Sequence, residues 1–246
     1  MASSQIVTRQ IDYSAGSTKL KGMLAVDSAV AGKRPGIVVF GEWWGFNPYL
    51  RRRAQDLAAL GYAALAADVY GDGVVAADAE EAGRRMNALF ADMNATSARI
   101  RAAVDTLAQQ PEVDSSRLGA MGYCLGGALS LHAARTGLPL RGVASFHGSL
   151  GKTHAAKAGD VKAKVLVCHG AEDKLVSTEE LAGFREEMNA LGVELEFHSY
   201  PGALHGFTNP EATANGKKFG LPLAYDAAAD RQSWNDSQAF WRRVMA

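Results

Sequence analysis

The chain has 246 residues, and its 26 lysines and arginines are balanced by 26 aspartates and glutamates. A length of this size is common for one domain in proteins that alternate strands and helices, so we expect a single domain over residues 1–246. A neutral chain without a strong basic run is not typical of proteins that bind nucleic acid or a membrane surface. We therefore expect neither kind of partner.

The cysteine content and the pattern of apolar residues indicate the cellular compartment. Two cysteines, Cys124 and Cys168, are too few for a disulfide framework. The N-terminal segment "MASSQIVTRQ" lacks the basic region and apolar stretch of a signal peptide. The sequence has no apolar run that approaches the roughly 18 residues expected of a membrane-spanning helix. These features predict a cytoplasmic protein, in which a free thiol stays reduced.

Short apolar runs alternate with amphipathic stretches along the chain. The first two runs flank the turn signal "SAGS" and predict an antiparallel hairpin. The runs predicted as strands cover residues 5–13, 19–26, 35–40, 62–70, 117–123, 142–148, 164–170 and 193–201. The stretches predicted as helices cover residues 47–61, 97–111, 125–137, 177–192 and 228–246, with a loop and a short helix within 71–92.

Helix-end signals support two of these helices. Asn47, Pro48 and Gly61 fit the N-cap, the first helical position and the C-terminal stop of the first helix. Ser177 is followed three residues later by Glu180, which predicts a capping box at the start of a later helix.

The alternation of strands and helices predicts an α/β fold. We expect a mostly parallel, twisted sheet with helices on both faces and an N-terminal antiparallel hairpin. Ligands of such sheets bind beyond the carboxyl ends of the strands. Four loops with glycines follow predicted strands, namely "GEWWG", "GYCLGG", "GAEDK" and "GALHGF". We expect these loops to gather at one edge of the sheet and to form the functional site.

Residues 122–126, "GYCLG", match the strand–turn–helix pattern G-x-S-x-G, with cysteine in place of serine. The turn is so sharp that side chains in place of its glycines would collide with neighbouring backbone. A nucleophile there lies at a helix N-terminus, where the dipole and free N–H groups favour a thiolate. The Leu125 N–H would face a developing oxyanion. The alternative for Cys124 is a packed core thiol, the role we expect for Cys168 in mid-strand.

A thiol nucleophile needs a base and a group that orients the base. Proteins with this turn carry them in the order nucleophile, acid, histidine. His205 follows the last strand and fits that order, whereas His147 and His169 are expected to be structural or pocket-lining. For the acid we favour Asp173 over Glu172, because Asp173 precedes the segment that leads into the next helix. The alternative for His205 is a surface histidine without a catalytic role. The alternative for Asp173 is a solvated loop carboxylate.

The loop "GEWWG" places one charge, Glu42, between an apolar strand and two tryptophans. In folds with this turn, the second oxyanion donor is a backbone N–H of this loop, and Trp43 is the candidate. A carboxylate in that setting is expected to be partly buried and to need a partner. The partner is either an arginine of "RRR" at 51–53 or a group beside the thiol.

Together, "GYCLGGALS", "GAEDKLV", "GALHGF" and "GEWWG" resemble the dienelactone hydrolase family of α/β hydrolases, from near residue 20 to the C-terminus. The resemblance implies a triad of Cys124 as nucleophile, His205 as base and Asp173 as orienting acid. It also implies that Glu42 lies near the cysteine, controls its ionisation and takes its proton when substrate enters.

The resemblance further implies that two arginines hold a carboxylate on the substrate. One follows the catalytic histidine, where this chain has Thr208 and Asn209 and no arginine. The other belongs to a helical segment near Arg84 and Arg85. Phe207 is a further candidate for substrate contact. The lack of the first arginine predicts a neutral substrate or one whose charge is placed differently.

These residues predict a hydrolase that cleaves a carboxylic ester or lactone through a thioester acyl-enzyme, as a monomer or small homo-oligomer. The alternative enzyme is a thioesterase or acyltransferase with the same triad. The alternative class is a non-catalytic relative that binds a small ligand. The sequence contains no H-E-x-x-H, Walker A or G-x-G-x-x-G motif, so no metal or cofactor is expected.

Overall fold

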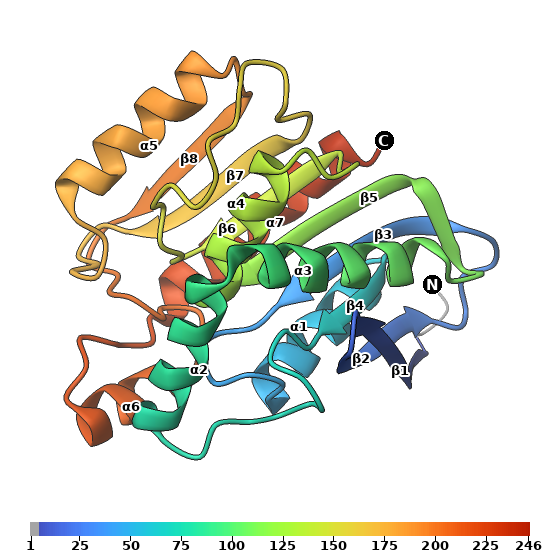
Figure 1. Ribbon diagram of the computed structural model, residues 1–246, viewed down its shortest axis with the longest axis horizontal. Coiled ribbons are helices and arrows are strands. Elements are labelled where there is room, and N and C mark those ends of the chain that lie inside the picture. The colour runs from blue at the N-terminus through green and yellow to red at the C-terminus, as the bar shows by residue number, and fades with distance from the viewer. Residues whose placement is uncertain (1–4) are drawn as a thin grey trace. The chain divides into compact units, whose positions relative to one another are not determined.

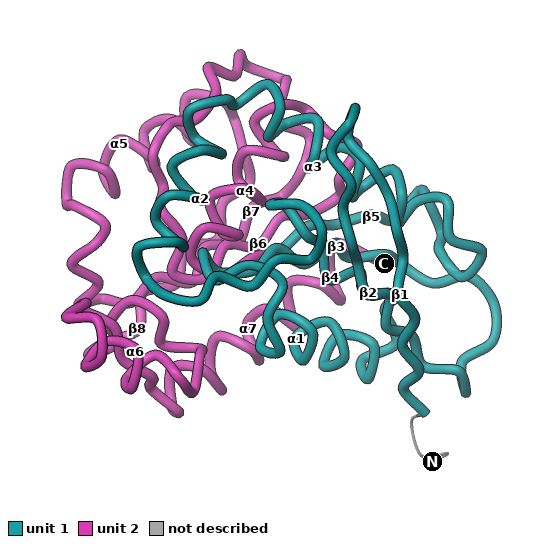
Figure 2. The backbone as a smooth tube through the Cα atoms, turned by 60° about the horizontal axis from the view of Figure 1, so that its bottom comes forward, with its two compact units in different colours: residues 1–121 teal, residues 122–246 magenta. Residues whose placement is uncertain are grey.

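The computed structural model describes residues 5–246, in which eight strands and seven helices follow one another (Figure 1). The chain forms two compact units, one ending at Met121 and one starting at Gly122, coloured separately in Figure 2. A single domain over the whole chain therefore stays a prediction, and each unit is described by itself.

The first unit contains a mixed sheet that begins with the predicted antiparallel hairpin. Strand β2 pairs antiparallel with β1 and β4, and β3 pairs parallel with β4, where Val38 lies opposite Leu65. The strand order is β1-β2-β4-β3-β5, and β5 continues into the second unit. The bounds are Ile6–Ala15 for β1, Thr18–Asp27 for β2, Arg34–Phe40 for β3, Ala63–Ala67 for β4 and Val113–Tyr123 for β5.

Helices cover both sides of the strands of the first unit. Figure 2 shows α1 and α3 on opposite sides of β3 and β4, and both helices pack on these strands. The strands are apolar and almost completely buried, as a sheet covered on both faces requires. The helix bounds are Pro48–Ala58 for α1, Ala79–Ala91 for α2 and Met93–Ala108 for α3.

The second unit begins with the end of β5 and continues through three parallel strands in the order β6-β7-β8. Figure 2 places α4 on one side of these strands and α7 on the other. The strands are Gly142–Phe146 for β6, Lys164–Gly170 for β7 and Leu195–Tyr200 for β8. The helices are Leu125–Arg135 for α4, Thr178–Ala190 for α5, Ala212–Phe219 for α6 and Ala227–Val244 for α7.

The predicted ends of α1 are confirmed. The Asn47 side chain accepts a hydrogen bond from the Leu50 N–H at 3.0 Å, and Pro48 is the first helical residue. Gly61 follows the helix with a φ of +91°, which a side chain would disfavour. The polar cap and the glycine stop thus act as the sequence indicated.

The predicted capping box of α5 is half wrong. Ser177 accepts a hydrogen bond from the Glu180 N–H at 3.1 Å, as expected. The Glu180 carboxylate does not return to the cap. It accepts hydrogen bonds from the Gly151 N–H and the Ser149 hydroxyl, both at 2.9 Å. A neighbouring loop with unpaired donors therefore outcompetes the local partner.

Helix α6 was not predicted, because its sequence "ATANGKKF" carries an asparagine and a glycine in the interior. Within residues 5–246, every helix is too short or too polar to cross a bilayer. The same residues contain no group of three or more histidine, cysteine or acidic side chains placed to hold a metal ion.

Candidate active site

Cys124 sits in a strained turn between the end of β5 and the start of α4. Its φ of +54° and ψ of −116° lie where side chains are rarely found, a conformation that costs about 1–3 kcal/mol. The turn is held at both ends, since the Cys124 N–H donates to the Phe146 carbonyl at 3.0 Å and the Cys124 carbonyl accepts from the Gly127 N–H at 3.0 Å. The predicted sharp strand–turn–helix element is therefore present.

The glycines of the turn are required by close backbone approach. A Cβ on Gly122 would lie 2.1 Å from the carbonyl carbon and oxygen of Gly126. A Cβ on Gly127 would lie 2.5 Å from the Ser145 hydroxyl and 3.0 Å from the Cα of Gly148. Small residues at these positions let the start of α4 lie directly on the end of β6.

We predict that Gly122→Ala lowers the free energy of unfolding by about 3 kcal/mol or more, because the added methyl meets backbone that cannot rotate away. Gly183→Ala is the matched control. Its Cβ meets nothing within 4 Å, and the change removes a glycine from the interior of α5. It is expected to raise stability by about 0.5–1 kcal/mol. Urea unfolding of both variants measures the difference, and equal stabilities would contradict the steric explanation.

Asp173 and His205 form the predicted pair. Asp173 Oδ2 lies 2.8 Å from His205 Nδ1, and both side chains are buried, at 0% and 7% exposure. The other carboxylate oxygen of Asp173 accepts the Leu175 N–H at 2.9 Å, which fixes the carboxylate at the start of the following loop. Glu172, the alternative acid, is exposed. The two buried groups come from the loops that follow β7 and β8, at the carboxyl ends of parallel strands.

The protonation of His205 is coupled to Cys124. Burial lowers the pKa of His205, but the charge of the Cys124 thiolate and the hydrogen bond to Asp173 outweigh it and raise the pKa to about 10. Among the described residues, His205 Nε2 is buried and has no hydrogen bond of normal geometry. The imidazole is thus anchored by Asp173 at Nδ1, while the thiolate favours a proton on the ring.

Leu125 is the first residue of α4, so its N–H has no acceptor within the helix. That N–H lies next to the nucleophile in the chain, where the sequence predicts an oxyanion donor. The second cysteine behaves differently. Cys168 is buried in β7, and burial raises its pKa to about 12. It is the core thiol that the sequence predicted.

Two further histidines lie at the carboxyl ends of strands of the second unit. His147 follows β6, is buried, and its ring contacts the ring of His205 with centroids 5.2 Å apart. His169 is the next-to-last residue of β7, and burial lowers its pKa. Both are thus buried near the candidate pair, in line with structural roles. Phe207 is fully buried against the rings of His147 and Tyr200, so its predicted contact with substrate stays a prediction.

Glu42 and Trp43 belong to the first unit and follow β3. Glu42 is only 6% exposed, which fits the burial expected of it. The Trp43 carbonyl accepts a hydrogen bond from the Tyr70 hydroxyl at 2.8 Å, and its ring packs against Trp44 with centroids 5.1 Å apart. The predicted roles of Glu42 beside the thiol and of the Trp43 N–H as an oxyanion donor stay predictions.

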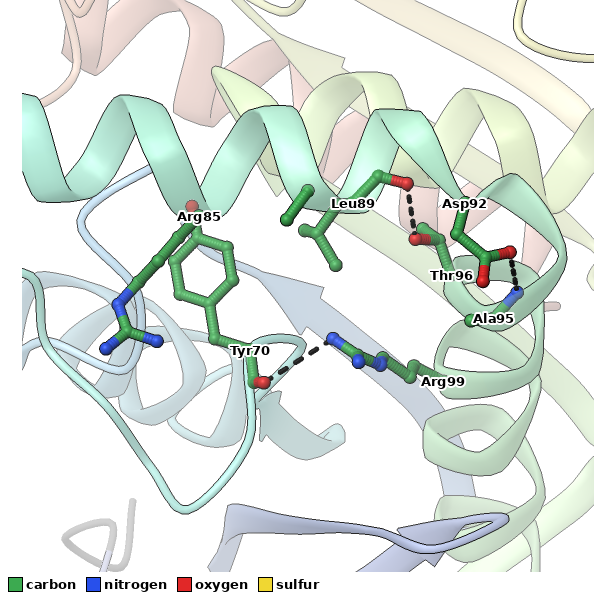
Figure 3. Close-up of a pocket in the computed structure, with 8 residues that line it drawn as sticks. Tyr70, Arg85, Leu89, Asp92, Ala95, Thr96 and Arg99 are labelled. Carbon is green, nitrogen blue, oxygen red and sulfur yellow. Dashed lines mark hydrogen bonds between the residues drawn. The ribbon is translucent and has the colours of Figure 1, made fainter.

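Arg85 lines a cavity of about 300 Å³ in the first unit, between α2, α3 and Tyr70 (Figure 3). Its guanidinium lies 2.7 Å from Glu81, which offsets its charge. Figure 3 shows Arg99 at the other side of the Tyr70 ring, donating to the Tyr70 carbonyl. Arg84 is exposed on α2. Arg85 is therefore already paired, which weakens the case for it as an anchor of a substrate carboxylate.

Comparison with known proteins identifies the family and the fold of this chain. A sequence profile described as the dienelactone hydrolase family matches residues 20–245. The solved structure of P91, named as a dienelactone hydrolase-like promiscuous phosphotriesterase from metagenomic libraries, is 39% identical. It superposes with a TM-score of 0.93 over 98% of this chain and 99% of that chain.

Two more relatives agree. A solved structure named m3DLH is 42% identical, with a TM-score of 0.93 over 98% of this chain and 99% of that chain. The carboxymethylenebutenolidase of Pseudomonas putida is 29% identical over 194 residues, which cover 76% of this chain and 81% of that protein.

Proposed function

The chain belongs to the dienelactone hydrolase family of α/β hydrolases, and from that premise we propose that it hydrolyses a carboxylic ester or lactone through Cys124, His205 and Asp173. The observation that carries this proposal is the buried 2.8 Å contact between Asp173 and His205, in the same unit as the strained turn that presents Cys124. A nucleophile, a base and an orienting acid are the minimum set for covalent acyl transfer.

In the proposed acylation step, the Cys124 thiolate attacks the carbonyl carbon and a carbon–sulfur bond forms. The negative charge passes to the carbonyl oxygen, where the Leu125 N–H, and by the family resemblance the Trp43 N–H, would stabilise it. The tetrahedral intermediate collapses to a thioester as the carbon–oxygen bond of the leaving group breaks. The imidazolium of His205 donates its proton to the leaving oxygen.

In the proposed deacylation step, neutral His205 takes a proton from water while the oxygen of that water attacks the thioester carbonyl. The carbon–sulfur bond breaks, the carboxylic acid leaves, and the thiolate is restored beside an imidazolium. Asp173 keeps Nδ1 of the ring protonated throughout, so that Nε2 is the atom that exchanges protons. The pKa of His205 is raised, which favours the protonated ring while the thiolate is present.

The choice of nucleophile favours substrates with good leaving groups. A thiolate leaves a tetrahedral intermediate more easily than an amine does, so an intermediate formed from a peptide returns to the starting material. Enol lactones and aryl esters release more stable anions, so their tetrahedral intermediates collapse to the thioester. We therefore propose an ester or lactone substrate rather than a peptide. Glu42 is proposed, by the family resemblance, to influence the ionisation of the thiol.

We propose that the substrate does not depend on a carboxylate anchor. Thr208 and Asn209 occupy the stretch in which the resemblance places one arginine, and Arg85 is paired with Glu81. The test is a panel of enol lactones and aryl esters, each with and without a carboxylate, assayed on the wild-type enzyme and on Arg85→Gln. Arg85→Gln is expected to leave kcat/KM for the uncharged members within about twofold, as substitutions away from reacting groups do. A clear preference for carboxylate substrates that Arg85→Gln abolishes would overturn the idea.

The pKa of His205 predicts the alkaline side of the pH profile. Because the pKa is raised from 6.5 to about 10, the imidazolium is present below pH 10 and is lost as the pH rises through that value. Acylation needs this proton for the leaving group, so kcat/KM is expected to fall about tenfold per pH unit beyond it. Steady-state assays from neutral pH upward, on protein shown to stay folded, measure the limb. A fall that begins near 6.5 would contradict the assignment.

Product analysis distinguishes the proposed hydrolase from the two alternatives, a thioesterase or acyltransferase and a non-catalytic ligand-binding protein. A thioesterase or acyltransferase with the same triad would pass its acyl group to a thiol or alcohol acceptor, so an added acceptor would yield a new ester or thioester in place of the free acid. A non-catalytic relative would bind an ester without forming product or an acyl adduct. Product analysis by chromatography, with and without acceptor, distinguishes all three.

A further inference from the structure

His147 adopts a conformation that its side chain disfavours. It follows β6 with a φ of +39°, a region where glycine is the usual residue, and it is only 1% exposed. Its N–H donates to the Cys168 carbonyl at 2.8 Å, which holds the strained residue in place. A strained, buried histidine persists only where its surroundings determine it, and such residues cluster at functional sites.

The same segment is tied to the nucleophile. The carbonyl of Phe146, the residue before His147, accepts the N–H of Cys124 at 3.0 Å. The backbone that positions Cys124 therefore leads directly into the residue whose ring touches His205. One short segment after β6 is thus in contact with both the candidate nucleophile and the candidate base.

The ring of His147 packs edge-to-face on two aromatic rings. Its centroid lies 5.2 Å from that of His205 at an interplanar angle of 64°, and 5.2 Å from that of Phe207 at 76°. Both geometries fall in the favourable range for tilted rings, and both are directional. Asp173 fixes His205 at one atom, Nδ1, which leaves the tilt of the ring to its neighbours.

Thr208 contacts a nitrogen of the same ring. Its hydroxyl oxygen lies 2.8 Å from Nε2 of His147, and Thr208 is fully buried. This residue belongs to the stretch where the family resemblance expects an arginine that faces substrate. In this chain the stretch instead turns a hydroxyl inward, onto the ring that supports His205.

We propose that His147, held by Thr208, is a positioning residue that sets the tilt of the His205 ring and so the direction in which Nε2 faces Cys124. The inference rests on the proposed function, because it gives His205 the role of base and proton donor. His147 acts through His205 and does not itself need to touch substrate. The pair adds a second support to His205 beside the one from Asp173.

The test compares His147→Gly, His147→Phe and Thr208→Val with the wild-type enzyme. Glycine accepts the positive φ without strain, so His147→Gly removes the ring without forcing the backbone. In His147→Gly the His205 ring is expected to lose its orientation, which lowers kcat about 10- to 100-fold with KM nearly unchanged. His147→Phe keeps a ring against His205 and is expected to recover part of the loss in kcat. Thr208→Val is expected to have a kcat between those of the wild-type enzyme and His147→Gly.

A second readout does not need substrate. The rate of alkylation of Cys124 by iodoacetamide at neutral pH reports how well His205 supports the thiolate, and peptide mass mapping distinguishes Cys124 from Cys168. We expect His147→Gly to slow alkylation of Cys124 and His147→Phe to restore much of it. A purely structural role, which lowers stability alone, would leave both the alkylation rate and kcat unchanged in protein that is still folded.

The matched control is Thr153→Val. Thr153 lies 2.9 Å from a ring nitrogen of His132, a second histidine–threonine pair in the same unit, whose ring packs against His154. This variant is expected to keep kcat within about twofold. If His147→Gly and Thr208→Val match it in kcat and alkylation, the proposal is overturned. If instead Cys124→Ala keeps full activity, the proposed function fails, while the alkylation series still decides whether His147 positions His205.

Discussion

Replacing Cys124 by alanine is expected to lower kcat on an activated aryl ester or enol lactone by about 10,000-fold or more. The thiolate supplies the bond that splits hydrolysis into two easier steps, and alanine has no group to replace it. The fold should persist, because alanine is smaller than cysteine and adopts the same backbone with similar strain. Steady-state assays with a chromogenic ester measure the loss, and circular dichroism shows that the variant is folded.

Cys168→Ala is the control for this experiment. It removes the other thiol, which lies buried in β7 and close to the Tyr200 hydroxyl at 3.4 Å. The change leaves a small cavity and is expected to cost about 1–2 kcal/mol of stability, with kcat unchanged below the unfolding transition. Equal activity losses in the two variants would mean that neither thiol is the nucleophile and that a general loss of folding explains both.

The second large effect is expected for Asp173→Asn, which should reduce kcat about 1,000- to 10,000-fold. An amide can present N–H to His205 Nδ1, which stabilises the wrong tautomer and leaves Nε2 carrying the proton when a base is needed. The negative charge that supports the imidazolium is also lost. The pKa of His205 should fall, because the hydrogen bond and the charge of Asp173 both raise it. The alkaline limb of kcat/KM should therefore move to lower pH.

Glu172→Gln makes the same chemical change at the neighbouring position. Glu172 is exposed, and its backbone N–H bonds to Ala203 in both forms. This variant is expected to keep kcat within about twofold, as exposed substitutions do. Reversed effects, with Glu172→Gln inactive and Asp173→Asn active, would move the acid to the other residue of "HGAEDKLV".

The turn at Cys124 could be predicted because its cause is local. Close contact with neighbouring atoms requires glycine at Gly122 and Gly127, and these glycines are visible in the sequence. The pairing of Asp173 with His205 could be predicted for a different reason. Parallel strands bring the loops after their carboxyl ends to one edge, so residues 32 positions apart meet at 2.8 Å.

The support behind His205 could not be predicted from the sequence. His147 was expected to be structural or pocket-lining, and its burial agrees, but nothing local indicates that its ring would meet His205 or that Thr208 would bind it. Such contacts depend on side-chain direction at the ends of strands, which periodicity does not record.

Errors at element boundaries have two kinds of cause. Strand β5 begins at Val113, four residues before the expected start, and α3 begins at Met93, where Asp92 accepts the Ala95 N–H at 2.9 Å. The Asp92 cap is local, so the start of α3 was within reach of sequence reasoning. The Glu180 carboxylate accepts a hydrogen bond from the Gly151 N–H and does not complete the capping box, and no local pattern predicts this loop contact. Tertiary hydrogen bonds override short-range preference wherever a buried donor needs a partner.

The most direct test of the account is the site of acylation. Wild-type protein and the Cys168→Ala variant are mixed with an activated ester of slow deacylation, quenched in acid, and mapped by peptide mass spectrometry. We predict one acyl group per chain, on the peptide that contains Cys124, and its loss on treatment with hydroxylamine, which cleaves thioesters. Turnover without an adduct on Cys124, or an adduct confined to another residue, would contradict covalent catalysis by this cysteine.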